Sequence, residues 1–332
     1  MRTEKLTASE SIAIDCMKAV SVFSVITAHV VTLQDFNMYT KIISSLYRVF
    51  GCVGVVVFYI IGGFFYTRGG EEGDGKSFWK KKLFRLILPW LFCASLTYAV
   101  SIALGAAPSV VSYLKYVFGI SSVYYYIVVY LLFLVIFKYL CKKEVFLWIA
   151  IGVHLISLLL TSLGSFDILP TAYMNILINP FNWIGYFSIG ILIRRHRLDT
   201  ALQNSRTVPI VACCIMLLSL FVILSRQIYG YFHVLTYLFT LSAAVLIAKG
   251  CYRFANCKAA AFVRKLGKAS YCIYLLHIQI VQAAMNFIPM GNFKATFAPV
   301  LSLLLMIILV SVGTFICKKL PFGDKLKMLF GL

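Results

Sequence analysis

The chain has few charged residues for its length, and acidic residues are especially scarce. Only 13% of its 332 residues are charged, with 11 Asp and Glu against 31 Lys and Arg. A soluble domain of this size could not cover its apolar surface with so few charges, because 61% of its residues are hydrophobic. The composition therefore excludes a soluble globular protein and favours an integral membrane protein.

Other absences exclude or disfavour further structural classes. The alternation of apolar and polar residues that is typical of membrane β-barrel strands is missing. The ten cysteines form no CxxC-type pattern, so we predict neither a disulfide framework nor a metal site. The first apolar run is too long for a cleavable signal peptide and contains Asp15, Lys18 and His29. No internal repeat supports an inverted-repeat transporter.

Apolar runs of about twenty residues recur along the whole chain, which is the length that a helix needs to cross a ~30 Å hydrocarbon core. The sequence thus predicts an all-α, polytopic integral membrane protein with about ten transmembrane helices. We place these helices at residues 12–33, 44–66, 83–103, 122–140, 145–164, 177–193, 207–225, 230–248, 270–288 and 297–317. Residues 113–119 could be a re-entrant piece or the start of a longer, tilted fourth helix. We expect one transmembrane domain over residues 1–332 and no separate soluble domain.

The net charge of +20 would suggest nucleic-acid binding in a soluble protein, but the positions of the basic residues give a better explanation. With the N-terminus inside, the inner loops and the C-terminal tail collect most of the Lys and Arg residues. The outer side keeps Lys41, Arg48, Lys115, Arg226 and Lys294. This asymmetry follows the positive-inside rule and predicts that both termini are cytoplasmic. The partner that the charge indicates is the lipid bilayer, not nucleic acid.

The first predicted span carries ionisable residues, which are costly inside a membrane and usually face a partner, a cavity or a substrate path. Asp15 and Lys18 are three residues apart, so they share a helix face and can pair. His29 follows Lys18 by eleven residues, which places it on roughly the same face and about 16 Å deeper. This arrangement suits a long anionic ligand whose reactive end reaches the histidine. It fits equally well a snorkelling Lys18 and a His29 that hydrogen-bonds a neighbouring helix.

A second basic cluster, Lys80-Lys81-Lys82, leads into the third predicted span. Lys82 and Arg85 share a helix face, and Pro89 is expected to kink the helix or open its backbone one turn later. Basic side chains beside a broken helix can hold phosphates. The alternative is a topogenic cluster next to an ordinary membrane proline.

His277 lies about two turns into the predicted ninth span, which runs outward as the first span does. His29 and His277 could therefore approach one another. Taken alone, a histidine in a span is more often a packed, hydrogen-bonded residue than a catalyst, and this applies more strongly to His154 and His233.

Five segments, in order along the chain, resemble the membrane-bound acyltransferase-3 family, whose members modify cell-envelope glycans and other hydroxyl acceptors. They lie at residues 14–30, 57–64, 82–89, 182–190 and 267–277. The chain departs from the family pattern where Gly62 replaces the usual serine, and where Lys18 and Lys82 stand in place of common arginines. Tyrosines 124–126 occupy a place where tryptophan is frequent. We expect neither the esterase-like domain nor the racemase domain that some relatives carry.

The resemblance implies an acyl-CoA donor bound from the cytoplasm and an acceptor at the outer face, either an envelope glycan or a lipid-linked sugar. It implies that His29 is the essential histidine. We therefore expect catalytic roles for His29, His277 and Asp15, with Asp15 positioning Lys18, and donor contacts from Lys18, Lys81, Lys82 and Arg85. The co-substrate would be acetyl-CoA or another short acyl-CoA, without a metal, and the protein would lie in a bacterial inner membrane.

Two rival functions are left open by the sequence. A transporter or flippase of an envelope glycan or lipid would line a path with the intramembrane polar residues and would tolerate an isosteric change at His29. A non-catalytic membrane module that docks a partner enzyme would keep full function after His29→Ala. The ordered motifs favour the acyltransferase.

Overall fold

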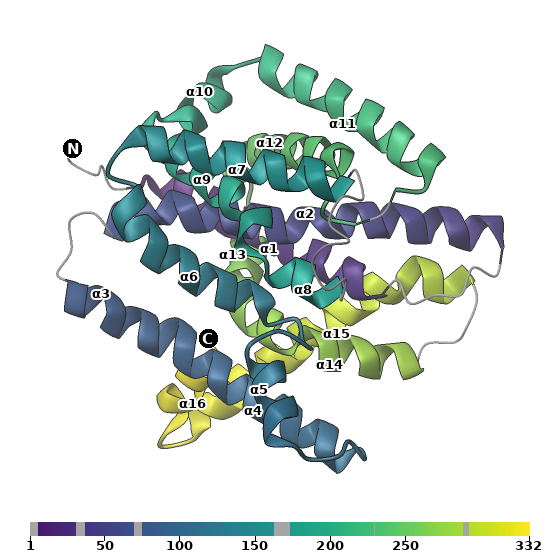
Figure 1. Ribbon diagram of the computed structural model, residues 1–332. Coiled ribbons are helices and arrows are strands. Elements are labelled where there is room, and N and C mark those ends of the chain that lie inside the picture. Colours follow the sequence, from purple (N-terminus) through teal and green to yellow (C-terminus); the bar gives the residue numbers. More distant parts are fainter. Residues whose placement is uncertain (1–5, 31–36, 70–74, 163–172, 229, 288–291) are drawn as a thin grey trace.

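The computed structural model describes residues 6–30, 37–69, 75–162, 173–228, 230–287 and 292–332, and these residues form helices and turns without any β-strand. The axes of most of the long helices are roughly aligned, and the chain reverses direction between α1 and α2 (Figure 1). The helices are α1 Ala8–Val30, α2 Met38–Gly69, α3 Gly75–Lys82, η1 Leu83–Ile87, α4 Leu88–Ala103, α5 Val110–Val117, α6 Tyr125–Leu140, α7 Glu144–Ser162, α8 Tyr173–Ile178, η2 Pro180–Asn182, α9 Ile184–Arg195, α10 Leu198–Asn204, α11 Thr207–Arg226, α12 Val234–Phe254, α13 Ala260–Lys268, α14 Ser270–Phe287, α15 Asn292–Lys319 and α16 Gly323–Leu329. The prediction of a helical protein is confirmed.

Seven helical segments in the described part of the chain are long and apolar enough to cross a membrane. They are Ala8–Val30, Met38–Tyr66, Lys76–Ala103, Glu144–Ser162, Thr207–Arg226, Val234–Phe254 and Thr296–Lys319. Two shorter apolar helices, Tyr125–Leu140 and Ser270–Met285, coincide with further predicted spans. The chain is thus a helical membrane protein, while the count of ten spans and the cytoplasmic placement of both termini stay predictions. The predicted span ends at 31–33, 163–164 and 288 lie outside the described residues.

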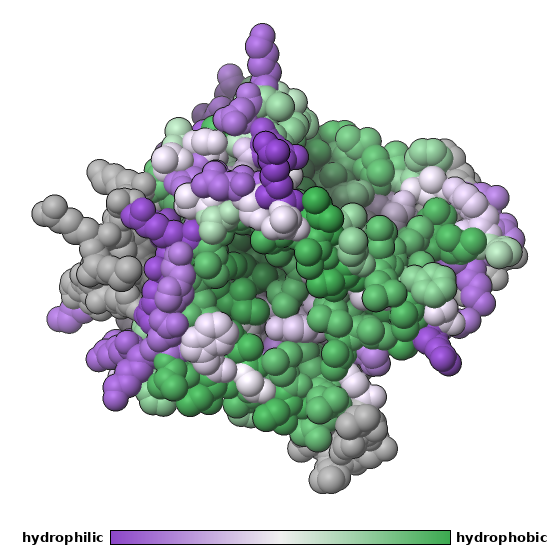
Figure 2. All heavy atoms as spheres, turned by 90° about the horizontal axis from the view of Figure 1, so that it is seen from above, coloured by the Kyte–Doolittle hydropathy of each residue, from purple (hydrophilic) through white to green (hydrophobic). Residues whose placement is uncertain are grey.

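The molecular surface fits a lipid environment. Figure 2 shows a broad area of hydrophobic side chains across one face, with hydrophilic side chains gathered toward its edges. On α11, for example, Val211, Leu218 and Phe221 are 56%, 67% and 71% exposed. Such a continuous apolar surface would be unfavourable in water and is expected where hydrocarbon covers it.

Two helices begin several residues earlier than predicted, and a capping box fixes each start. At α1, the backbone N–H of Thr7 donates to Glu10 Oε2 at 2.7 Å, and that of Glu10 donates to Thr7 Oγ1 at 3.1 Å. At α2, Asn37 and Thr40 exchange equivalent bonds of 3.1 and 3.0 Å. These side chains satisfy N–H groups that lack a partner within the helix. The apolar pattern misses these polar first turns, so it placed the starts too late.

The third predicted span opens into a π-helical turn, η1, between α3 and α4. In this turn the N–H of Leu88 donates to the carbonyl of Leu83. Pro89 explains the opening, because it has no N–H and its ring would clash with the carbonyl of Arg85 in a regular helix. The predicted disturbance beside Pro89 is therefore present, on its N-terminal side.

The span predicted at 177–193 is interrupted as well. The short helix η2, with Pro180 at its first turn, separates α8 from α9. Asn182 Nδ2 donates to the carbonyl of Ile176 at 3.0 Å, so a side chain supplies a bond that the interrupted backbone lacks. One continuous helix over 177–193 is not formed.

Residues 113–119 are not the start of α6. Residues 113–117 belong to a separate helix, α5, whose start is capped by the Ser109 side chain. Gly119 follows with φ +75°, a conformation that favours glycine, and α6 begins only at Tyr125.

Glycines let α2 and α9 pack backbone against backbone. A Cβ atom added at Gly63 would lie 2.0 Å from the carbonyl oxygen of Phe187, and one at Gly190 would lie 2.0 Å from that of Ile60. Close approach of this kind is a common way for helices to associate in membranes. The contact holds the middle of α2, which lines the site described below.

We expect Gly190→Ala to lower the thermal stability of the purified protein, because the added methyl group would push α2 away at a cost of about 1–3 kcal/mol. The measurement is the fraction of monodisperse protein that survives heating, followed by size-exclusion chromatography. The control is Gly152→Ala on α7, where an added Cβ has no neighbour within 4 Å. Equal stability of the two variants would show that α2 and α9 do not need this contact.

Candidate active site

α1 carries three of the residues predicted for the site, and it lies in the middle of the bundle. It packs against α2, α12, α13 and α14 (Figure 1). Asp15 and Lys18 lie in its first half, and His29 lies in its last turn. At 1.5 Å per residue, Lys18 and His29 are separated by about 16 Å along the helix axis. One helix thus connects a cationic region to a histidine, as the spacing predicts.

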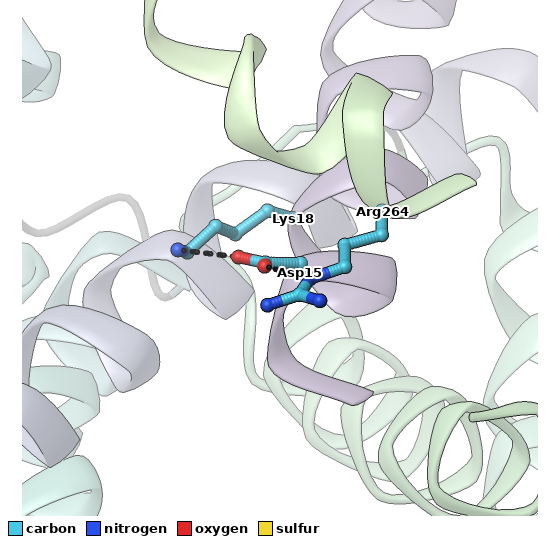
Figure 3. Close-up of polar contacts among 3 residues, drawn as sticks. All are labelled: Asp15, Lys18 and Arg264. Carbon is cyan, nitrogen blue, oxygen red and sulfur yellow. Dashed lines mark hydrogen bonds and ion pairs between the residues drawn. The ribbon is translucent and has the colours of Figure 1, made fainter. Parts of the chain in front are cut away.

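Asp15 shares its carboxylate between two cations. Its Oδ1 lies 3.2 Å from Lys18 Nζ, and its Oδ2 lies 3.3 Å from Arg264 Nε. Figure 3 shows the carboxylate between the two basic side chains. The Asp15 side chain is only 10% exposed. A carboxylate so buried is stable only when it is paired and hydrogen-bonded, so this ion pair joins α1 to α13.

Gly267 allows α13 to approach α1 this closely. A Cβ at this position would lie 1.8 Å from the carbonyl oxygen of Asp15. The glycine therefore brings Arg264, one turn earlier on α13, within reach of Asp15. Sequence reasoning assigned Arg264 only to an inner loop, and no local spacing connects two residues 249 positions apart.

The four residues predicted to contact the donor line one cavity. Lys18, Lys81, Lys82 and Arg85 surround a space of about 560 Å³, and Lys268 joins them from α13. We call this space the basic cavity. Its remaining walls are largely aromatic: Phe58, Phe65, Phe78, Tyr126, Tyr130, Tyr271 and Tyr274. Cations from α1, the α3–η1 segment and α13 thus converge, although they are far apart in sequence.

Aromatic rings hold two of these cations in place. Lys82 Nζ donates to the hydroxyl of Tyr130 at 3.3 Å and lies 5.5 Å from the ring centroid of Phe78. Lys18 Nζ lies 5.6 Å from the ring centroid of Phe65. Such cation–π contacts compensate part of the hydration that these ammonium groups lose.

The π-helical turn shapes the wall that carries Arg85. Tyr271 lines the cavity, and its hydroxyl donates to the carbonyl of Leu86 at 2.6 Å. This bond ties α14 to the widened turn and so fixes the position of Arg85 relative to Lys18. Sequence reasoning missed Tyr126, Tyr130, Tyr271 and Tyr274 as cavity residues, because apolar and aromatic residues are ordinary in any span.

His29 and His277 lie next to one another. Their ring centroids are 4.9 Å apart, with an angle of 52° between the ring planes. His277 is 1% exposed, and its Nδ1 lies 2.6 Å from the carbonyl oxygen of Tyr274. A carbonyl can only accept, so Nδ1 carries the hydrogen in this bond. The Nε2 of His277 has no partner among the described residues.

Two tyrosines separate the basic cavity from the histidines. Neither histidine is among the residues that line the cavity. Tyr274 lines it, and its ring centroid lies 5.6 Å from that of His277. Tyr126 also lines it and lies 5.5 Å from Tyr274. Tyr274 thus contacts both the cavity and His277, and we call Tyr126 and Tyr274 the tyrosine partition.

The other buried histidine, His154, has structural contacts. Its Nδ1 lies 3.1 Å from the carbonyl oxygen of Phe181, and its ring packs on Tyr186 and Tyr237. Gly185 makes room for this ring, because a Cβ there would lie 2.8 Å from it. His233 caps the start of α12 by accepting from the N–H of Leu235. Both fit the packing roles that the sequence favours.

Comparison with known proteins adds one decisive finding. A family model described as an acyltransferase domain matches residues 11–318, which is nearly the whole chain. The chain belongs to the acyltransferase-3 family. It is therefore a membrane acyltransferase, and the match includes most of α1, the basic cavity and the histidine pair. No curated protein and no solved structure matches the chain.

Gly62, noted above as a departure from the family pattern, has a structural consequence in this acyltransferase. Gly62 lines the basic cavity, and a Cβ there would lie 2.6 Å from Cε2 of Tyr130. A serine would therefore require the Tyr130 ring to move. Because Tyr130 also accepts the hydrogen bond from Lys82, this departure is coupled to the position of a cavity cation.

We expect the effects of Asp15→Asn and Arg264→Gln on unfolding to be strongly non-additive, because each change breaks the same ion pair. The coupling free energy should reach about 1–2 kcal/mol. It is measured as a double-mutant cycle, by comparing the free energies of unfolding of wild type, both single variants and the double variant in detergent without added lipid. The matched control is the exposed pair Asp324 and Lys327, whose carboxylate side chain is 96% exposed. Its coupling should stay under about 0.5 kcal/mol. Similar coupling in both cycles would contradict a structural role for Asp15.

Proposed function

We propose that this acyltransferase moves a short acyl group, most simply acetyl, from cytoplasmic acyl-CoA to a hydroxyl of a cell-envelope polysaccharide or a related acceptor such as a lipid-linked sugar. The main support is the combination, in one bundle, of a cation-lined cavity and an adjacent histidine pair. The first suits a polyanionic donor, and the second suits acid–base or nucleophilic chemistry. No metal is needed for this reaction.

The phosphates of CoA would lie among the cations of the basic cavity. Lys18, Lys81, Lys82 and Arg85 all line it, and Lys268 adds a further positive charge. Arg offers a planar, multi-donor contact to phosphate, whereas Lys acts as a compact point charge. Asp15 would orient Lys18 toward the cavity rather than contact the donor, because a carboxylate would repel the phosphates.

Two routes for the acyl group fit the histidine pair. In the first, His29 takes the proton of the acceptor hydroxyl, the oxygen attacks the thioester carbon, and the C–S bond breaks to release CoA thiolate. In the second, a nitrogen of His29 attacks the thioester carbon and CoA leaves, and the acceptor oxygen then attacks the acyl-histidine and frees the imidazole. In either route Nε2 of His277 could accept or return a proton, since it has no other partner in the described chain.

The positions of the groups suggest a direction across the membrane. The cations lie toward the start of α1 and the histidines toward its end. We therefore assign the basic cavity to the cytoplasmic side and acceptor entry to the opposite side, in a bacterial inner membrane with both termini cytoplasmic and a single transmembrane domain. The second route explains how an acyl group could cross while CoA stays inside.

We expect His29→Ala and His29→Gln to reduce release of free CoA from acetyl-CoA by about 10²–10⁴-fold, because both remove the base or nucleophile. The assay uses purified protein in nanodiscs, with and without crude envelope glycan. The control is His196→Gln, because His196 is exposed and pairs with Glu144 at 3.0 Å, outside the site. Equal CoA release by wild type and the His29 variants would sink this mechanism and favour transport of an intact substrate.

We expect Lys82→Met and Arg85→Met to raise the KM for acetyl-CoA roughly tenfold and to change kcat much less, since a lost charge-assisted bond to phosphate weakens ground-state binding. Lys142→Met, in the turn between α6 and α7, is the control for a change of charge alone. A donor lacking the 3′-phosphate sharpens the test. A variant that loses a contact to that phosphate should be less sensitive to its removal than wild type. A fall in kcat with unchanged KM would mean that these cations do not bind the donor.

A further inference from the structure

A second cavity at the basic end of the bundle lies outside the proposed reaction. It is a groove of about 590 Å³ bounded by α13, the first turns of α14, the last half of α15 and the α16 segment. α14 contacts α13 and α15, and α15 contacts α16; α14, α15 and α16 lie in the lower part of Figure 1. We call it the lysine groove. Only Lys268 lines both the lysine groove and the basic cavity.

The walls of the lysine groove are apolar and face the bundle exterior. They are formed by Phe262, Leu266, Ile273, Ile307, Val310 and Phe315. Phe262 and Phe315 are 64% and 62% exposed, so the groove is open at the side. On α15, only 17% of the span is buried, compared with 67% of α1. α15 is therefore a peripheral helix, and the groove on it opens to the exterior of the bundle.

Four lysines gather at one end of this apolar groove. Lys265 and Lys268 come from α13, Lys318 from the last turn of α15, and Lys327 from α16. Asp324 pairs with Lys327 at 2.9 Å and offsets one of these charges. The other three make no ion pair with any residue of the described chain, so their charge is available to a ligand.

We propose that the lysine groove binds one anionic phospholipid, with its acyl chains along α14 and α15 and its phosphate among the lysines. Basic pockets between helices at the inner face of a membrane suit anionic headgroups, and each Lys near the surface adds about 1 kcal/mol of attraction. A lysine cluster that served orientation alone would need no concave apolar wall. Here the cations of three separate helices converge at the end of one apolar channel.

Such a lipid would support α13, the helix that presents Arg264 to Asp15. The C-terminal segment would be held at the same time, because Lys327 of α16 lines the groove. Phe330, just after α16, packs on Phe92 of α4, with ring centroids 5.3 Å apart. The lipid would thus brace two elements that also contact the walls of the basic cavity, without taking part in acyl transfer.

The test is direct lipid binding, measured by native mass spectrometry on delipidated protein in detergent. Wild type is titrated with dioleoyl phosphatidylglycerol and with dioleoyl phosphatidylcholine, and binding of the anionic lipid should be at least tenfold tighter. Lys265→Gln with Lys318→Gln should weaken phosphatidylglycerol binding by roughly 10- to 30-fold. The matched control is Lys142→Gln with Lys143→Gln, which removes the same charge elsewhere and should leave the affinity unchanged. Lys265 and Lys318 do not line the basic cavity, so the result is independent of acyl transfer.

A second variant tests the apolar part. Ser311 lines the groove and is exposed, so Ser311→Trp should fill the channel and reduce phosphatidylglycerol binding while leaving the lysines intact. Soluble glycerol 3-phosphate should not displace the lipid, because it lacks the chains. Equal affinity for the two lipids, equal losses in both double variants, unchanged binding by Ser311→Trp, or full displacement by glycerol 3-phosphate would each overturn the proposal.

Discussion

The carboxylate of Asp15 lies where α1 meets α13, and the pairing of this one anion constrains much of the site. A carboxylate that is 10% exposed needs both of its cations, one from the same helix and one from α13. Satisfying both fixes the rotation of α1 about its axis and its contact with α13, where Gly267 leaves room. The same rotation decides which way Lys18 and His29 face. The basic cavity and the histidine pair therefore both depend on it.

A related constraint explains the irregular helices. Backbone groups in a membrane protein must find partners inside the protein, because hydrocarbon offers none. At η1 and η2 the helix opens beside a proline, and Tyr271 and Asn182 supply hydrogen bonds to nearby carbonyls. Tyrosine hydroxyls also join α6 to α14, since Tyr124 donates to the carbonyl of Leu275 and Tyr274 to that of Val123. The second of these bonds holds Tyr274, which lines the basic cavity and packs against His277.

The separation of the permanent cations from the histidines follows from the free-energy cost of placing a charge in hydrocarbon. Permanent cations lie at one end of the bundle, where their ammonium and guanidinium groups keep access to water or phosphate, and the titratable imidazoles lie deeper. α13 links the two basic regions, because it presents Arg264 to Asp15 and carries Lys268 between the basic cavity and the lysine groove. This short helix therefore contacts both the lysine groove on the bundle exterior and the candidate site.

The sequence by itself determined the membrane class, most of the spans and the pairing of Asp15 with Lys18, because hydrophobic length and helical spacing are local properties. It also pointed to Lys82, Arg85, His29 and His277, since an ionisable residue in an apolar run is conspicuous. The residues of the capping boxes at Thr7 and Asn37 are visible in the sequence, but they lie outside the apolar runs that were used to place the helices. Only the tertiary structure decided that Arg264 reaches Asp15, that tyrosines separate cations from histidines, and that residues 177–193 are broken. Those features arise from contacts between distant helices, and no spacing along one helix encodes them.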